Sequence, residues 1–161
     1  MKVLSKQEGV TWCYNHGVVL NDRELPDLSG AEFKFGIPND AQKRIYLAKQ
    51  AVCELSNAPS VLVWFNDWSV WPSGQRMHIF DRLRISYGDA RPIVEAPAQL
   101  FEQMEIEDAI SFVTIAVLFL WDCYVVCPNK DRFVFFSHDE YGVVKGMDFH
   151  EQIPWLNTHQ A

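Results

Sequence analysis

The side chains best suited to acid–base chemistry stand in one run near the carboxyl end of the sequence, Ser137-His138-Asp139-Glu140. Histidine titrates near neutral pH, so His138 is the candidate general acid or base. The run is expected on a strand, where neighbouring side chains point to opposite faces. Ser137 and His138 are therefore not expected to act together as nucleophile and base. If a turn begins at Asp139, its carboxylate should cap local backbone amides.

Residues that ligate metals lack the spacing that a bound ion requires. His150-Glu151 is not followed by the second histidine of an HExxH motif. Cys123 and Cys127, if on one strand, would lie about 13 Å apart, which is too far for one zinc ion. The sequence also contains no glycine-rich phosphate loop, GxSxG motif or dinucleotide fingerprint. We therefore expect neither a metal nor a cofactor.

Residues 68–91 hold the densest set of groups that recognise other molecules. Aromatic rings beside guanidinium groups are typical of interface hot spots. A helix that begins at Ser73 would also present free N–H groups, with Arg76 in its first turn, to an anion. The candidate binding residues are Trp68, Trp71, Ser73, Arg76, Arg82, Arg84 and Tyr87.

These residues also have a structural interpretation. Trp68 and Trp71 would then cover the core, and the arginines would pair with the acidic residues of the same segment, which are Asp67, Asp81 and Asp89. The sequence leaves both interpretations open.

Composition favours one acidic globular domain. The chain has 161 residues, 48% of them hydrophobic, and a net charge of −7. No Lys or Arg occurs between Arg91 and Lys130, an interval that holds Glu95, Glu102, Glu105, Glu107, Asp108 and Asp122. Such a surface repels nucleic acid and can steer a basic partner protein, although a solvated helix end would look the same.

Cysteine usage and hydropathy predict a cytoplasmic protein. Residues 1–9 are polar and do not form a signal peptide, so the four cysteines, Cys13, Cys53, Cys123 and Cys127, are expected as reduced thiols. The longest apolar run, residues 110–121, is shorter than the roughly 20 residues that span a bilayer. We expect no membrane association.

In the first half of the chain, short strands are expected at residues 10–14 and 18–20, followed by a loop at 22–30. A helix should begin after Pro38 with Asn39 as its cap and Gln42 completing a capping box. Its apolar face would comprise Ile45, Ala48, Val52 and Leu55. The continuous apolar run 61–65 predicts a strand buried on both faces.

A second helix is expected at residues 74–87, with Gly88 as its stop. Its buried stripe would be Phe80, Leu83 and Tyr87. A third should begin near Glu105 with acidic residues in its first turn. It is apolar on all sides from Phe112, although its β-branched residues leave a strand as the alternative.

The last predicted unit is a hairpin of residues 120–127 and 132–138, joined by a turn at 128–131, with a further strand at 141–145. The tail from about residue 148 should be a surface loop or frayed end. Helices and strands mix without βαβ alternation. The expected fold is therefore one α+β domain over residues 1–161, with an antiparallel or mixed sheet and about three helices packed mainly on one face.

Several strings occur together between about residues 60 and 144: Trp68-Ser69-Val70-Trp71-Pro72-Ser73, Leu83-Arg84-Ile85-Ser86-Tyr87-Gly88-Asp89, Ala96-Pro97 with Leu100-Phe101, Trp121-Asp122 and Ser137-His138-Asp139-Glu140-Tyr141. This pattern resembles an uncharacterised family of small bacterial proteins. The resemblance implies a bacterial, cytoplasmic protein and no particular activity. Size, acidity and aromatic content are also similar to those of bacterial immunity proteins, which neutralise a toxin by binding it.

Two functions therefore remain. The first is a non-enzymatic protein-binding module, immunity-like in one version, that binds another protein. The alternative is an enzyme or small-ligand protein, in which Arg76 and Arg84 clamp an anionic substrate, Ser73 donates a hydrogen bond and His138 acts as acid or base. A two-fold homodimer is compatible with either function.

Overall fold

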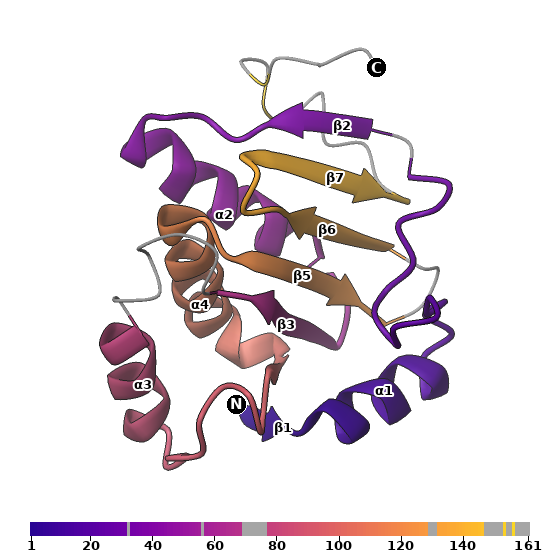
Figure 1. Cartoon of the computed structure of the whole chain (residues 1–161), viewed down its shortest axis with the longest axis vertical. Helices are drawn as coiled ribbons and strands as arrows, with labels where there is room; N and C mark the ends of the chain where they lie inside the picture. Colours follow the sequence, from indigo (N-terminus) through magenta and orange to yellow (C-terminus); the bar gives the residue numbers. More distant parts are fainter. Residues whose placement is uncertain are drawn as a thin grey trace.

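The computed structural model describes residues 1–31, 33–55, 57–68, 77–128, 132–146, 153 and 156 (Figure 1). Its centre is a seven-stranded antiparallel sheet in the order β1-β4-β3-β5-β6-β7-β2. The strands are β1 (Lys2–Leu4), β2 (Phe33–Gly36), β3 (Ser60–Asp67), β4 (Ala98–Glu102), β5 (Asp122–Cys127), β6 (Arg132–Phe136) and β7 (Tyr141–Lys145). The helices are α1 (Lys6–Asn15), α2 (Ala41–Leu55), α3 (Met77–Ser86) and α4 (Ile106–Phe119), with a 3₁₀ turn at Gln103–Glu105. The α+β class is confirmed.

Strand β3 lies in the interior of the sheet, paired with β4 on one side and β5 on the other. Its side chains alternate between two cores. Val63 and Phe65 belong to the core under α2 and α4, whereas Leu62 and Trp64 belong to the core under α1. The prediction of a strand buried on both faces at residues 61–65 is confirmed.

Helices α2 and α4 cover one face of the sheet, and α3 lies at the outer edge of this helical layer (Figure 1). The anchor of α3 is Phe80, whose ring centroid lies 4.8 Å from that of Phe65, 5.5 Å from Phe112 and 5.8 Å from Trp121. The expected three helices on one face are therefore present. The described residues add a fourth, α1, on the opposite face.

Helix α1 replaces the strand predicted at residues 10–14, which was wrong. Ser5 Oγ accepts a hydrogen bond from the Glu8 N–H, and the Glu8 carboxylate accepts one from the Ser5 N–H. This capping box is a local helix signal that the alternation of Val10 and neighbouring apolar residues obscured. The strand predicted at 18–20 was also wrong, because Leu20 forms only an isolated bridge to Pro26.

Helix α2 begins later than predicted, and its buried face is rotated. The Asp40 carboxylate, rather than Asn39, accepts a hydrogen bond from the Lys43 N–H at 2.8 Å. Ile45 is 46% exposed, contrary to prediction. The buried residues are Arg44, Leu47, Ala48, Ala51, Val52 and Leu55. Arg44 tolerates burial because its Nε donates to the Pro38 carbonyl at 2.6 Å.

Helix α3 is described from Met77 onward, so the predicted cap Ser73 lies outside the described residues. Gly88 ends the helix as predicted, with a φ of 84° that suits glycine. Phe80 is buried as expected, but Tyr87 is exposed and Arg84 is buried in its place.

The segment that could have been a helix or a strand is helix α4, and Glu107 and Asp108 lie in its first turn as predicted. Leu120 caps it in a left-handed conformation, so β5 begins at Asp122 rather than at 120. Strand β7 has the predicted bounds, whereas β6 ends at Phe136, so Ser137 and His138 lie in the following turn and not on the strand predicted at 132–138. Of the turn predicted at 128–131, only Pro128 lies within the described residues. Strand β4 was not predicted.

The tail is not simply a surface loop. Ile153 and Leu156, its two described residues, are both buried in the core under α2 and α4. The prediction of a frayed end fails at these two positions because both are apolar side chains that the core accommodates.

Gly142 should tolerate no side chain. It pairs with Phe35 across β7 and β2, and a Cβ at this position would lie 2.1 Å from the Phe35 ring. Phe35 is fully buried and cannot move aside freely. Gly142→Ala should therefore lower the free energy of unfolding by about 2 kcal/mol or more, measured by urea denaturation. In a Phe35→Leu background the loss should shrink, and an equal loss in both backgrounds would contradict this explanation.

Candidate functional site

The candidate binding residues of the 68–91 segment fall into different environments. Trp71, Ser73 and Arg76 lie outside the described residues. Trp68 is half-buried and packs against the core under α2 and α4. Arg82 is exposed on α3.

Arg84 faces the protein interior rather than a partner. It is 1% exposed, its Nη2 lies 3.5 Å from Asp89 Oδ1, and its guanidinium carbon lies 5.5 Å from the Phe80 ring centroid. Its Nε and Nη1 have no hydrogen-bond partner among the residues that the structure describes. Burial lowers the pKa of the Arg84 guanidinium, and the Asp89 carboxylate partly offsets this effect. This geometry matches the structural interpretation, in which an arginine pairs with Asp89.

Asp89 also fixes the position of the segment that follows α3, through its ion pair with Arg91. Arg91 Nε lies 3.0 Å from Asp89 Oδ2, and Arg91 Nη2 donates to the Val3 carbonyl of β1 at 3.0 Å. The hydrogen bond from Arg91 is the largest cause of the lowered pKa of the Asp89 carboxyl, with further contributions from the Arg91 backbone and from Arg84. Two of the arginines of this segment therefore hold its fold.

The outward side of α3 carries the apolar groups instead. Ile79 is 41% exposed and Ile85 is 52% exposed, and the exposed Arg82 lies between them along the helix. Tyr87, which is 36% exposed, extends this side beyond the end of the helix. We call Ile79, Arg82, Ile85 and Tyr87 the α3 face.

The α3 face borders an acidic turn. Asp108 lies near Tyr87, and burial, followed by the interaction with the Asp108 carboxylate, raises the pKa of the Tyr87 hydroxyl to about 12. Asp108 belongs to the first turn of α4, next to the exposed Glu107. In the preceding 3₁₀ turn, Met104 is fully exposed. An acidic border with an exposed apolar side chain therefore adjoins the α3 face.

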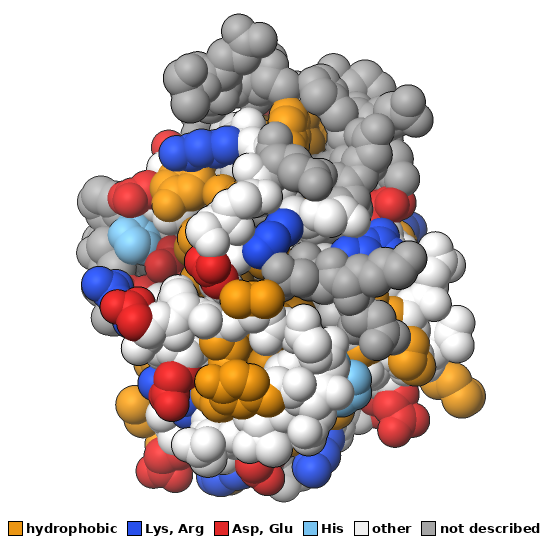
Figure 2. Space-filling model, turned by 90° about the vertical axis from the view of Figure 1, so that its right-hand side faces the viewer, with side chains coloured by type: hydrophobic (Ala, Val, Ile, Leu, Met, Phe, Trp, Pro, Cys, Tyr) orange, Lys and Arg blue, Asp and Glu red, His pale blue; other side chains and the backbone are white. Residues whose placement is uncertain are grey.

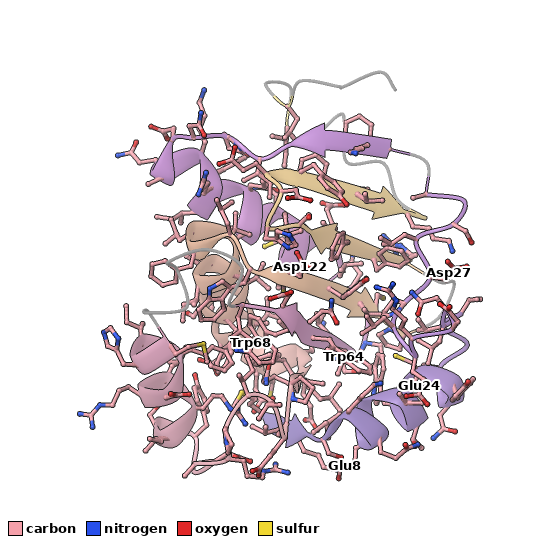
Figure 3. All side chains as sticks on the ribbon, viewed as in Figure 1. Glu8, Glu24, Asp27, Trp64, Trp68 and Asp122 are labelled. Carbon is pink, nitrogen blue, oxygen red and sulfur yellow. The ribbon has the colours of Figure 1, made fainter. Side chains whose placement is uncertain are left out.

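The acidic interval of the sequence is only partly on the surface. The Glu105 carboxylate forms an ion pair with the N-terminal ammonium group of Met1. Asp122, at the start of β5 (Figure 3), is largely buried. Its Oδ1 accepts the backbone N–H of His138 at 2.7 Å and lies 2.8 Å from the His138 ring Nδ1. Asp122 therefore holds the turn after β6 rather than contributing to an acidic surface.

His138 has the geometry of an oriented histidine. Because the Asp122 carboxylate accepts at Nδ1, the other ring nitrogen, Nε2, is directed away from it, 3.5 Å from Asp139. His138 borders a pocket of about 440 Å³ together with Leu120, Asp139 and Glu140. The carboxylates of this lining favour a cationic or hydrogen-bond-donating group over an anion.

The neighbouring serine has a structural role. Ser137 Oγ accepts the Asp139 N–H at 3.2 Å, so the hydroxyl of Ser137 caps this turn, where the carboxylate of Asp139 was expected to do so. Among the hydrogen bonds of the described residues, none joins the Ser137 hydroxyl to the His138 ring, as a nucleophile and its base would require.

Within the described ranges, no cluster of three His, Cys, Asp or Glu side chains is arranged to hold a metal ion. None of the helices in that part of the chain is long and apolar enough to cross a membrane. No disulfide joins any of the four cysteines, all of which are among the described residues, and burial raises the pKa of the Cys13 thiol to about 12. The chain matches no protein-family model, no curated protein and no solved structure.

Sequence reasoning overlooked Ile79, Ile85 and Met104. The first two could have been found from helical spacing, because Phe80 and Leu83 were assigned inward and residues 79, 82 and 85 therefore point away from the core. No sequence signal indicates that Met104 is exposed, since its position follows from the 3₁₀ turn before α4.

Replacing Arg84 by methionine should stabilise the fold. Arg84→Met removes a buried charge and two unpaired donors while leaving Asp89 with Arg91, so the free energy of unfolding should rise by about 1 kcal/mol. Urea denaturation measures this change. Arg82→Met, on the exposed side of the same helix, is the control and should change it by less than about 0.5 kcal/mol. A loss of about 2 kcal/mol or more in Arg84→Met would show instead that the guanidinium is fully satisfied.

Proposed function

We propose that this chain is a non-enzymatic protein-binding module of immunity-like type, acting in a bacterial cytoplasm, and that its contact surface is the α3 face. The observation that carries this proposal is the outward exposure of Ile79 and Ile85 on either side of Arg82. A surface helix normally directs its apolar residues inward, so two exposed branched side chains on one short helix favour an interaction site.

The composition of the α3 face suits protein recognition. Arginine and tyrosine are enriched among residues that dominate binding energy, and aliphatic neighbours exclude water around them. Arg82 is exposed, and the Tyr87 ring packs near the buried Phe112 ring with their centroids 6.0 Å apart, so a partner would meet one guanidinium and one oriented phenol. A helix at the edge of the fold is also accessible to a groove on another protein.

Charge favours a basic partner. The chain carries a net charge of −7, and the α3 face adjoins the acidic first turn of α4. The face shown in Figure 2 carries acidic and basic side chains intermixed, so the acidic excess is not concentrated there. Acidic groups at the border of a contact surface accelerate association with a basic protein and disfavour nucleic acid.

Paired substitutions test the proposal. Ile79→Glu/Ile85→Glu should weaken binding of the captured partner at least tenfold, because two carboxylates would be desolvated against an apolar contact. The measurement is affinity capture from a bacterial lysate with mass spectrometry, followed by titration with the purified partner. The control is Ile45→Glu on α2, which is equally exposed but lies on another helix.

The same experiment separates the alternatives. A partner retained by the folded double variant as tightly as by the wild type would contradict the assignment of the α3 face. If the only captured protein is this chain itself, the face is a homodimer surface, and size-exclusion chromatography should then show a dimer that the double variant lacks.

The alternative function is an enzyme or small-ligand protein that acts through His138. Its support is the Asp122–His138 pair, because a carboxylate that orients a histidine is the arrangement used in acid–base catalysis. An anionic substrate gains less support, since Asp139 and Glu140 line the pocket and Arg84 is buried against Asp89.

This alternative is tested by thermal shift with inorganic phosphate. We expect phosphate to raise the melting temperature equally in the wild type and in His138→Gln, because the carboxylates around the ring repel an anion. A stabilisation present in the wild type and absent in His138→Gln would favour the alternative function.

A further inference from the structure

A second pocket lies at the carboxyl end of β3, between the start of α1 and the segment that precedes β4. Its volume is about 320 Å³. Strand β3 leaves its regular register with β5 between Phe65 and Asp67. Such an irregularity redirects a side chain, and here the exposed Asn66 lines the pocket. No residue of the α3 face lines this pocket, so the inference is independent of the proposed function.

The floor of the pocket is rigid and aromatic. Trp64 is 1% exposed and Phe65 is fully buried. The Trp64 ring packs directly on α1, where a Cβ at Gly9 would lie 3.0 Å from it. Trp68, half-buried, forms a further wall, and Figure 3 shows both tryptophans at this part of the sheet. This floor is closed, so the aromatic surface that a planar apolar group can reach is the Trp68 wall.

The rim carries an excess of positive charge. Lys6 and Arg23 both line the pocket. Lys6 Nζ is paired with Glu24 at 2.9 Å, whereas the guanidinium of Arg23 has no ion pair with any described carboxylate. The rim therefore combines two cations with one neighbouring carboxylate, in a chain whose net charge is −7. A local positive excess on an acidic protein attracts an anion.

We infer that this pocket binds a small organic anion, a carboxylate carried on a single aromatic ring. The ring would lie against the partly exposed Trp68, and the carboxylate would meet the Arg23 guanidinium, whose planar donors suit it. The Asn66 amide and Lys6 add donors at the rim. The volume is at the lower limit of ligand pockets, which favours one ring over a nucleotide.

Phenylacetate is the probe, titrated into the full-length chain and followed by NMR at the methyl groups of Leu25 and Val94, which also line the pocket. Saturable shifts should appear at both residues. Arg23→Gln should raise Kd at least tenfold, and Arg82→Gln, the exposed arginine of α3, should leave Kd unchanged. The uncharged analogue 2-phenylethanol should bind the wild type at least tenfold more weakly. Trp68→Ala should weaken phenylacetate binding by a similar factor.

Three results would overturn the inference. The first is the absence of any saturable shift at millimolar phenylacetate. The second is equal Kd for the wild type and Arg23→Gln, or for phenylacetate and 2-phenylethanol, which would remove the charge recognition. The third is a shift confined to Ile79 and Ile85 methyl groups, which would place the ligand on the α3 face. None of these results bears on partner binding by the α3 face, which Arg23→Gln leaves intact.

Discussion

The burial of β3 on both faces is the constraint on which the rest of the structure depends. A strand with five successive apolar side chains, residues 61–65, must be covered on two sides, and its pairing with β4 and β5 places it inside the sheet. Helices α2 and α4 cover one face and α1 covers the other. The remaining elements follow from this arrangement, since α3 is attached through Phe80 to the Phe65 side of β3 and the Trp64 side receives α1.

Because only a few residues of α3 attach it to the core, its outer side is available to bind a partner. Phe80 and Arg84 are its buried residues, and Met77 and Leu83 pack partly buried against the same core. The chain beyond the helix is fixed by the Asp89–Arg91 pair and by the bond from Arg91 to β1. The helix is thus held at its inner side and at its end, while Ile79, Arg82 and Ile85 face solvent. A helix fixed in this way presents a rigid face, which reduces the entropy lost on binding a partner.

Local patterns in the sequence predicted the elements that carry strong signals. The continuous apolar run of β3, the acidic first turn of α4 and the apolar residues of β5 each act over a few residues. Helix α1 was missed because Val10, Trp12 and Tyr14 alternate as in a strand, although Ser5 and Glu8 formed a capping box. The short strand β4 has no distinctive pattern, because its position depends on pairing with β1 and β3.

The sites were less predictable, since they are assembled from distant segments. Asp122 and His138 meet only because β5 and β6 pair in one register, and nothing local indicates that the Arg84 side chain points inward. The pocket near Trp64 combines Lys6 and Arg23 with the end of β3, which share no spacing that a motif could describe. Residue types predicted the available chemistry, whereas the fold decided which groups come together.

Site-specific photocrosslinking tests the central claim most directly. A p-benzoylphenylalanine in place of Arg82 samples the middle of the α3 face, and the same residue in place of Ile45 samples α2. If the α3 face is the binding surface, irradiation in bacterial cells should give one discrete protein adduct from position 82 and none from position 45. An adduct that forms equally from both positions, or only from position 45, would contradict the claim that the α3 face is the binding surface.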